Sequence, residues 1–245
     1  MREKTMGINI AIRETECRNA LCREKKLKIV RVLTDNPEKY GEAAEIQHTV
    51  SKESAEKVVD DWGSFLKRNR LGKDTETVHT ELLTDENDIA KLKPLAESSY
   101  TGWVELGLLD SDDAEKALAE SRPENRTTEW ELVTFDEMAE ICAECALSWD
   151  KGRGCIGTFG PDKSQLPGIA DKYGCPIVAS VPEMAASKKE LTPEDAESLL
   201  KEIAILREAL PKEGKQKVNW YSGTLDRMEC VAEISKSEGC GFFFF

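Results

Sequence analysis

Gly7-Ile-Asn-Ile-Ala-Ile12 alternates isoleucine with smaller residues. A period of two places the three isoleucines on one face of an extended chain, and it predicts a β-strand with one buried face. A short polar segment follows and carries Cys17 and Cys22. The first predicted strand therefore leads directly to two of the eight cysteines of the chain.

Helices and short strands are expected to alternate along the rest of the chain. Apolar residues at helical spacing predict a helix within residues 38–70, and residues 175–181 have the composition of a buried strand. A further helix is predicted over residues 193–210, because Thr192 is a good cap and Pro193 suits the first helical position. Since the expected strands are short and irregularly separated, we expect an α+β fold, with a mixed α/β fold as the alternative.

A polar connection, Arg122 to Thr128, indicates where the chain divides. We expect a mixed α/β domain over residues 1–125 and a cysteine-rich domain, which binds a metal or a cluster, over residues 126–245. Near the start of the second domain, Thr134 and Glu137 have the spacing of a capping box and predict the beginning of a helix.

The composition is that of a globular protein with an acidic surface. Among 245 residues, 47 acidic side chains outnumber 34 basic ones, and the formal net charge is −13. This charge argues against a nucleic-acid backbone as the main partner, because phosphate binding needs a basic footprint. The sequence contains no run of 18 apolar residues that would predict a membrane span. It also shows no apolar leader segment that would predict secretion. We therefore expect a cytoplasmic protein that binds neither nucleic acid nor a membrane.

The eight cysteines are the main chemical signal in the sequence. Without a secretory signal, cysteines are more often metal ligands or redox groups than partners in structural disulfides. Nearly 120 consecutive residues contain none, so the cysteines are unevenly distributed. They form three groups: Cys17 and Cys22; Cys142, Cys145, Cys155 and Cys175; and Cys230 and Cys240.

The middle group supplies the donors of a four-thiolate site. Cys142 and Cys145 are three positions apart in the last turns of a predicted helix, where their side chains share one face. Cys155 lies in a glycine-rich loop, and Cys175 directly precedes Pro176. Four cysteine thiolates are the usual ligands of an iron–sulfur cluster or of a structural zinc ion.

The spacing of this group favours an iron–sulfur cluster, of the 4Fe–4S type, over zinc. Zinc sites usually contain two short chelating pairs, and only one pair here has that form. A C-x2-C pair with a distant Cys-Pro is closer to ferredoxin-type spacing, although the tight run of three cysteines is absent. Glycines around Cys155 also let backbone N–H groups approach anionic sulfurs. Zinc is the alternative, and thiols without a metal are a third interpretation.

The flanking cysteines leave several interpretations open. Cys17, Cys22, Cys230 and Cys240 form a second four-thiolate site if the two chain ends meet, as is common in compact domains. Alternatively, Cys17 and Cys22 complete or shield the first site. In a third interpretation some of the four are buried as small hydrophobic residues, since cysteine buries readily.

The chain ends in four consecutive phenylalanines, Phe242 to Phe245. Four exposed phenylalanines would be an aggregation liability. We expect them to be buried, either in the core of this chain or in a groove of a partner.

Three functions compete at this stage. The first is an iron–sulfur protein that carries electrons, alone or as a subunit of a larger redox complex, and docks its acidic surface on a basic protein partner. The second is an enzyme that uses the Cys142 and Cys145 thiolates in sulfur transfer or disulfide reduction, although the helix dipole disfavours a thiolate near a helix C-terminus. The third is a non-enzymatic assembly or interaction factor with a structural zinc site. The sequence leaves open whether the protein is an enzyme.

Overall fold

The computed structural model describes residues 7–148, 156–161 and 164–245. The described chain contains helices and two separate antiparallel sheets. This architecture confirms the expected α+β class. None of the described helices combines the length and the apolar character that crossing a membrane requires.

Contacts divide the chain into two compact units. Unit 1 comprises Met1–Lys28 and Glu129–Phe245, and unit 2 comprises Ile29–Thr128. Unit 2 is therefore inserted between two parts of unit 1. The second junction lies near the boundary expected after residue 125, whereas the first 28 residues group with the C-terminal part of the chain. Division into separately folding domains stays a prediction.

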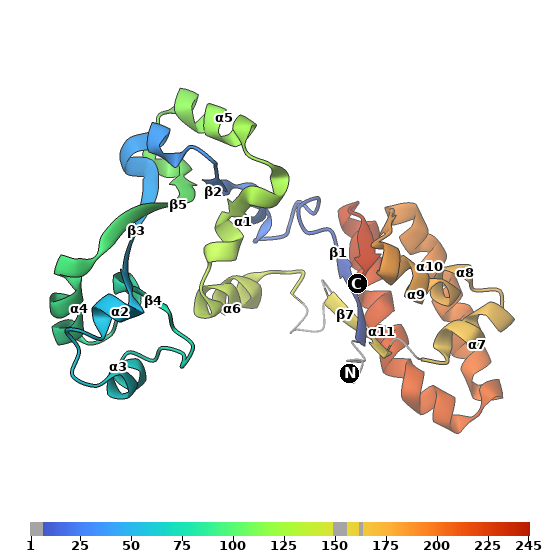
Figure 1. Ribbon diagram of the computed structural model, residues 1–245. Coiled ribbons are helices and arrows are strands. Elements are labelled where there is room, and N and C mark those ends of the chain that lie inside the picture. The colour runs from blue at the N-terminus through green and yellow to red at the C-terminus, as the bar shows by residue number, and fades with distance from the viewer. Residues whose placement is uncertain (1–6, 149–155, 162–163) are drawn as a thin grey trace. The chain divides into compact units, whose positions relative to one another are not determined.

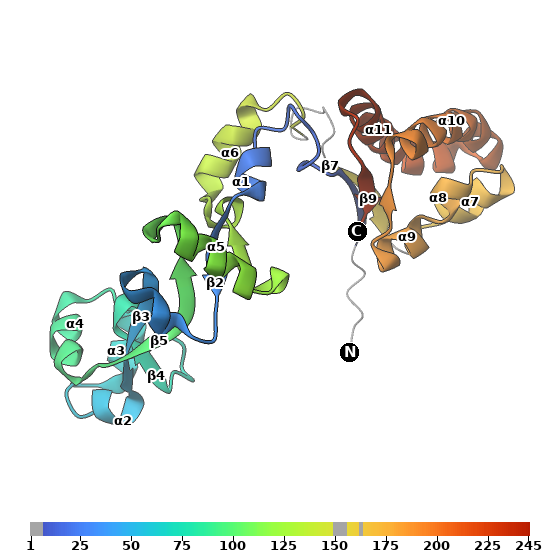
Figure 2. The same cartoon turned by 90° about the horizontal axis from the view of Figure 1, so that it is seen from above.

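The sheet of unit 1 has the strand order β7-β1-β9-β8. The strand predicted from the isoleucine alternation is β1 (Gly7–Ile12), which pairs antiparallel with β7 (Ile156–Pro161) on one side and β9 (Phe242–Phe244) on the other. The short strand β8 (Glu190–Leu191) pairs with the far edge of β9. Figures 1 and 2 show these strands gathered beside helices of unit 1. A central strand of the sheet thus comes from one end of the chain and its neighbour from the other.

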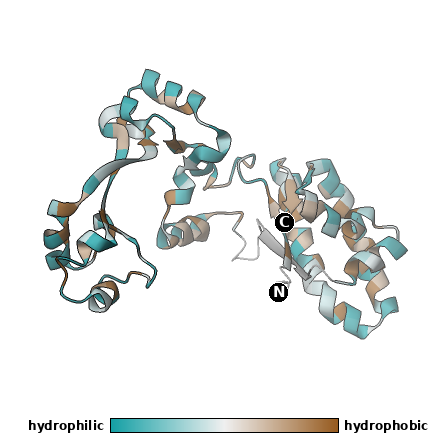
Figure 3. Cartoon of the chain, in the orientation of Figure 1, coloured by the Kyte–Doolittle hydropathy of each residue, from teal (hydrophilic) through white to brown (hydrophobic). Residues whose placement is uncertain are grey.

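The phenylalanine tail completes this sheet. Phe242 and Phe244 are fully buried in the core of unit 1, whereas Phe245 is 45% exposed. Backbone hydrogen bonds fix the end of the tail, because the Asn9 N–H donates to the Phe245 carbonyl at 2.8 Å and the Phe245 N–H donates to the Asn9 carbonyl at 3.0 Å. In Figure 3 the strand at the C-terminus has the brown colour of hydrophobic residues. Of the two expected locations of the tail, the core of its own chain is confirmed for Phe242 and Phe244, whereas Phe243 is half-buried and Phe245 is exposed.

Five helices form the second layer of unit 1. The α11 helix packs on β7 and β1, and α10 packs along α11. The α10 helix begins as predicted, since the Thr192 hydroxyl accepts from the Asp195 N–H and Pro193 is its first residue. The five are α7 (Leu166–Lys172), α8 (Pro176–Ala179), α9 (Val181–Ser187), α10 (Pro193–Ala209) and α11 (Lys215–Glu238).

The strand expected over residues 175–181 is wrong, because this segment forms α8 and the start of α9. A carboxylate from α10 explains the difference. The buried Glu202 side chain accepts hydrogen bonds from the N–H groups of Ile177 at 3.0 Å and Val178 at 2.9 Å. These are N–H groups that the first turn of a helix leaves without partners, so Glu202 caps α8 from a distant part of the chain.

Two further helices of unit 1 are α1 (Arg23–Leu27) and α6 (Phe135–Glu144). The predicted capping box opens α6, because the Thr134 hydroxyl accepts from the Glu137 N–H while the Glu137 carboxylate accepts from the Thr134 N–H.

The 3-10 helices of the two units are η1 (Pro37–Ala43), η2 (Thr80–Leu82), η3 (Lys93–Leu95), η4 (Leu106–Leu108), η5 (Pro123–Asn125), η6 (Glu129–Leu132) and η7 (Leu210–Glu213).

Unit 2 is built on an antiparallel sheet with the order β4-β3-β5-β2-β6. Its longest strands, β3 and β5, pair side by side, and its helices lie near the two ends of this pair (Figure 1). Its strands are β2 (Ile29–Leu33), β3 (Ala44–Ser51), β4 (Thr77–His79), β5 (Glu97–Glu105) and β6 (Arg126–Thr128). Its α-helices are α2 (Lys52–Ala55), α3 (Trp62–Arg68), α4 (Glu86–Leu92) and α5 (Ser111–Glu120).

The helix expected within residues 38–70 is wrong for the first half of that range, where β3 forms, although α2 and α3 lie later in it. Ala44 and Val50 are buried in two different clusters at the two ends of β3, whereas Ile46 and His48 between them are exposed. Pairing decides the conformation, since β3 lies between β4 and β5 in the sheet. Such long-range pairing overrides a local apolar spacing that also fits a helix.

A buried carboxylate joins α3 to α4 in unit 2. Asp88 is 1% exposed and accepts hydrogen bonds at 2.6 Å from both Nε and a terminal nitrogen of Arg68. Asn69 also donates to Asp88 at 2.6 Å, and the Asn69 side-chain oxygen accepts from the N–H groups of Thr84 and Asp85. The network satisfies these polar groups and fixes the start of α4 against the end of α3.

Replacing Asp88 is expected to destabilise unit 2 in a pH-dependent way. The Arg68 hydrogen bonds, aided by Asn69, hold the pKa of Asp88 below its usual value despite burial. A lowered pKa in the folded state adds stability above the ordinary pKa, and this stability is lost as the pH falls through the folded value. Asp88→Asn should therefore lower the free energy of unfolding at pH 7 by about 2–3 kcal/mol.

Urea unfolding of the wild type and the variant at neutral and strongly acidic pH checks this expectation. The difference between the two proteins should shrink at acidic pH. Asp74→Asn is the matched control, because Asp74 is exposed and makes no hydrogen bond or ion pair with a described residue. A neutral-pH effect of Asp88→Asn no larger than that of the control, or a difference that does not change with pH, would contradict the network's role.

Candidate functional site: the cysteines of unit 1

The core of unit 1 gathers cysteines from remote parts of the sequence. Its buried residues include Cys17, Cys22, Cys145, Cys175 and Cys240. These belong to the turns after β1, the end of α6, the start of α8 and the segment between α11 and β9. All eight cysteines belong to unit 1, since the sequence of unit 2, Ile29–Thr128, contains none.

Cys17 and Cys240 form a disulfide that joins the two ends of the chain. Their Cα atoms are 5.3 Å apart although 223 positions separate them in sequence. Both residues are 0% exposed. Next to the disulfide, the Arg13 N–H donates to the Gly241 carbonyl at 2.7 Å. A second cysteine site was expected to require that the two ends of the chain meet. Cys17 and Cys240 meet in this way.

Two glycines place Cys240 against Cys17. Gly239 ends α11 with a φ of 66°, a left-handed conformation that glycine adopts at little cost. At Gly241 a Cβ atom would lie only 2.8 Å from the Leu191 carbonyl oxygen, so a larger residue would push the strands apart. The Gly241 N–H also donates to the Glu16 carboxylate at 2.8 Å.

Cys145 lies against the segment that carries Cys17 and Cys22. Its backbone N–H donates to the Ile141 carbonyl at 3.1 Å, and its Sγ lies 4.0 Å from the Asn19 carbonyl oxygen. Asn19 stands between Cys17 and Cys22 in a run of turns, and Cys22 is the residue before α1. The structure thus brings Cys145 to the segment that connects the disulfide with Cys22.

The other members of the predicted sites are placed differently. Cys142 and Cys230 lie on α6 and α11 with half-buried side chains. Burial, together with the charge of Glu233, raises the pKa of Cys230. Cys155 lies outside the described residues. Within the part of the chain that the structure describes, no three histidine, cysteine or acidic side chains are grouped as a metal site requires.

Cys175 has its own partners, in contacts that involve no other cysteine. Its buried thiol lies 3.8 Å from the Tyr173 carbonyl oxygen and 3.7 Å from the Glu202 carbonyl oxygen. Burial and the nearby Glu202 charge raise the pKa of this thiol, which favours the protonated form over the thiolate that a metal binds. A role for Cys175 as a ligand beside Cys142 and Cys145 stays a prediction.

Sequence spacing alone did not reveal two features of this region. The pairing of Cys17 with Cys240 has no local signature, although the flanking Gly239 and Gly241 are a hint that the backbone passes close to another strand. The second feature is Glu202, whose carboxylate caps α8, the helix that directly follows Cys175. Its position on the buried side of α10 is the signal that could have marked it as a polar group with a structural partner.

Reduction of the disulfide is expected to destabilise unit 1. A cross-link across so long a loop restricts the unfolded chain, and its loss should cost about 2–5 kcal/mol. Urea unfolding with and without a thiol reductant measures the effect in the wild type. Cys17→Ser should unfold identically in both conditions, because it has no disulfide to lose. If the reductant does not change the unfolding of the wild type, the disulfide does not stabilise unit 1. If it still destabilises Cys17→Ser, a bond other than Cys17–Cys240 causes the effect.

Comparison with known proteins finds no relative. No protein-family model matches the chain. No curated protein and no solved structure matches it at a significant level. Function must therefore be argued from the residues of the site.

Proposed function

We propose that the protein is an iron–sulfur protein that transfers electrons and that cysteines of unit 1 hold its cluster. One observation carries the proposal: Cys17 is bonded to Cys240, and the Cys145 sulfur contacts the Asn19 carbonyl in the run of turns between Cys17 and Cys22. Four thiolates are the usual ligands of a 4Fe–4S cluster. The proposed ligands are thus Cys17, Cys22, Cys145 and Cys240, whereas Cys175 is explained by its backbone partners.

The disulfide and a thiolate site are two oxidation states of the same cysteines. Two electrons and two protons convert the Cys17–Cys240 disulfide into two thiols. Loss of their protons then gives the thiolates that bind iron, so metal binding depends on reduction and on pH. A reducing cytoplasm, which is part of this proposal, would supply the thiol form.

The burial of these sulfur atoms supports electron transfer over direct thiol chemistry. Exchange with a partner disulfide requires a thiolate that reaches the partner's sulfur. Cys17 and Cys240 are fully buried, and Cys22 and Cys145 are nearly so. Electrons, unlike sulfur atoms, pass through a thin protein shell, so a buried cluster can exchange them with a protein docked on the surface. The net charge of −13 suits a basic partner of this kind.

The Cys17–Cys240 disulfide favours a second candidate, a thiol–disulfide redox protein. In this function the disulfide itself accepts two electrons from a dithiol partner. Because both sulfurs are buried, the end of α11 and the strand β9 would have to open for each reaction. Because this opening would cost free energy in every reaction, the cluster is the better-supported proposal.

Anaerobic purification followed by iron and acid-labile sulfide analysis tests the proposal. We expect a coloured protein with about four irons and four sulfides per chain. Cys145→Ser should lose both the visible absorbance and the iron. Cys175→Ser is the control and should keep them, because Cys175 already has two backbone partners.

The other outcomes are equally informative. A colourless chain with bound zinc would support a structural metal site in an assembly factor. A colourless, metal-free chain whose Cys17–Cys240 pair is reduced and reoxidised would support the thiol–disulfide candidate. Loss of iron in Cys175→Ser but not in Cys145→Ser would restore Cys175 to the ligand set and overturn the set proposed here.

A further inference from the structure

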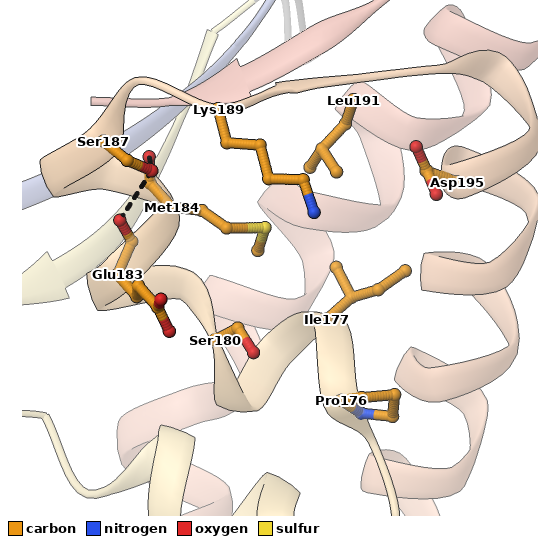
Figure 4. Close-up of a pocket in the computed structure, with 9 residues that line it drawn as sticks. All are labelled: Pro176, Ile177, Ser180, Glu183, Met184, Ser187, Lys189, Leu191 and Asp195. Atoms are coloured by element: carbon orange, nitrogen blue, oxygen red, sulfur yellow. Dashed lines mark hydrogen bonds between the residues drawn. The ribbon is translucent and has the colours of Figure 1, made fainter.

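Unit 1 contains a small pocket that none of its described cysteines lines. It lies between α8, α9, β8 and the start of α10 and has a volume of about 290 Å³. Ile177, Met184 and Leu191 form its apolar surface, and charged and hydroxyl side chains surround them (Figure 4). Pockets for small molecules begin at roughly 300 Å³ and are mostly apolar with a few placed polar groups. This pocket is therefore the size of a small metabolite.

Lys189 supplies the only cation among the described residues that line the pocket. Figure 4 shows its ammonium reaching toward Ile177, with Met184 on one side and Asp195 on the other. The ammonium makes no hydrogen bond or ion pair with any described residue. Lys189 is exposed to solvent, so its ammonium is available to pair with a ligand that carries an anionic group near the apolar surface.

The same pocket also presents carboxylates with unused acceptor atoms. Asp195 uses one oxygen, Oδ2, to accept from the Thr192 N–H at 2.9 Å and the Thr192 hydroxyl at 3.2 Å. Its other oxygen makes no hydrogen bond with a described residue, and neither does the Glu183 carboxylate. The lining therefore holds an ammonium and two carboxylates that are not paired with one another.

We propose that this pocket binds a free amino acid with an apolar side chain. The amino acid's carboxylate pairs with Lys189, its ammonium pairs with Asp195, and its side chain packs on Ile177 and Met184. A simple anion would leave the two carboxylates repelling it, and a simple amine would be repelled by Lys189. Only a small ligand with both charges satisfies both signs at once. The proposal is independent of the cluster, since no cysteine of the described part of the chain lines the pocket.

Calorimetric titration of the full-length protein with L-leucine tests this proposal. Two analogues each keep one of leucine's two charged groups. 4-Methylpentanoate lacks the ammonium, and 3-methylbutylamine lacks the carboxylate. We expect leucine to bind at least about tenfold more tightly than either analogue, because each analogue loses one charge-assisted contact. No heat of binding up to about 10 mM leucine, or equal binding of either analogue, would overturn the proposal.

A matched pair of lysine variants locates the binding site. Lys189→Met should weaken leucine binding about tenfold, since it removes the partner of the carboxylate. Lys188→Met removes the same charge from the neighbouring exposed residue, which does not line the pocket, and should leave the affinity unchanged. Equal effects of the two substitutions would overturn the assignment. Iron content measured in the same samples separates failure of this proposal from failure of the proposed function.

Discussion

The pairing of β1 with β9 is the interaction on which unit 1 depends. Ile10 lies opposite Phe244 and Ile12 lies opposite Phe242, and all four side chains are buried in one core. Each such side chain contributes roughly 1.5–3 kcal/mol when it leaves water. Because one strand comes from the N-terminal segment and the other from the last residues, the sheet forms only when the chain ends meet. The intervening unit 2 has a sheet and buried clusters of its own, so it does not interrupt this closure.

The chemistry of unit 1 follows from this closure. The register that places Phe242 beside Ile12 also carries Cys240 to Cys17, and the left-handed Gly239 lets α11 end where the tail must begin. The contact of Cys145 with the same N-terminal segment then brings a third sulfur to the region. The arrangement brings together segments whose cysteines are scattered in sequence, and it is the basis of the cluster proposed above. The pocket beside Lys189 lies between α8, α9, the start of α10 and β8, the strand that pairs with the edge of β9.

Local signals predicted the parts of the fold that local chemistry decides. The isoleucine alternation located β1, and the cap at Thr192 located α10, because the residues that cause these elements are neighbours in sequence. The strand β3 was missed because its apolar spacing also fits a helix, and the choice rests on pairing with distant strands. For the same reason the helical α8 could not be foreseen without Glu202. Cysteine spacing grouped Cys142, Cys145, Cys155 and Cys175, whereas closure of the sheet joins Cys17 to Cys240, a pairing that spacing does not predict.

Comparison of Phe244→Ala with Phe245→Ala by urea unfolding tests the central claim most directly. Both variants remove the same side chain at adjacent positions of the tail, but Phe244 is fully buried and Phe245 is 45% exposed. If the tail closes unit 1, Phe244→Ala should lower the free energy of unfolding by about 3–5 kcal/mol. Phe245→Ala should lower it by no more than about 1 kcal/mol. Equal and small effects of the two substitutions would contradict the account, because they would mean that the tail is not part of the core.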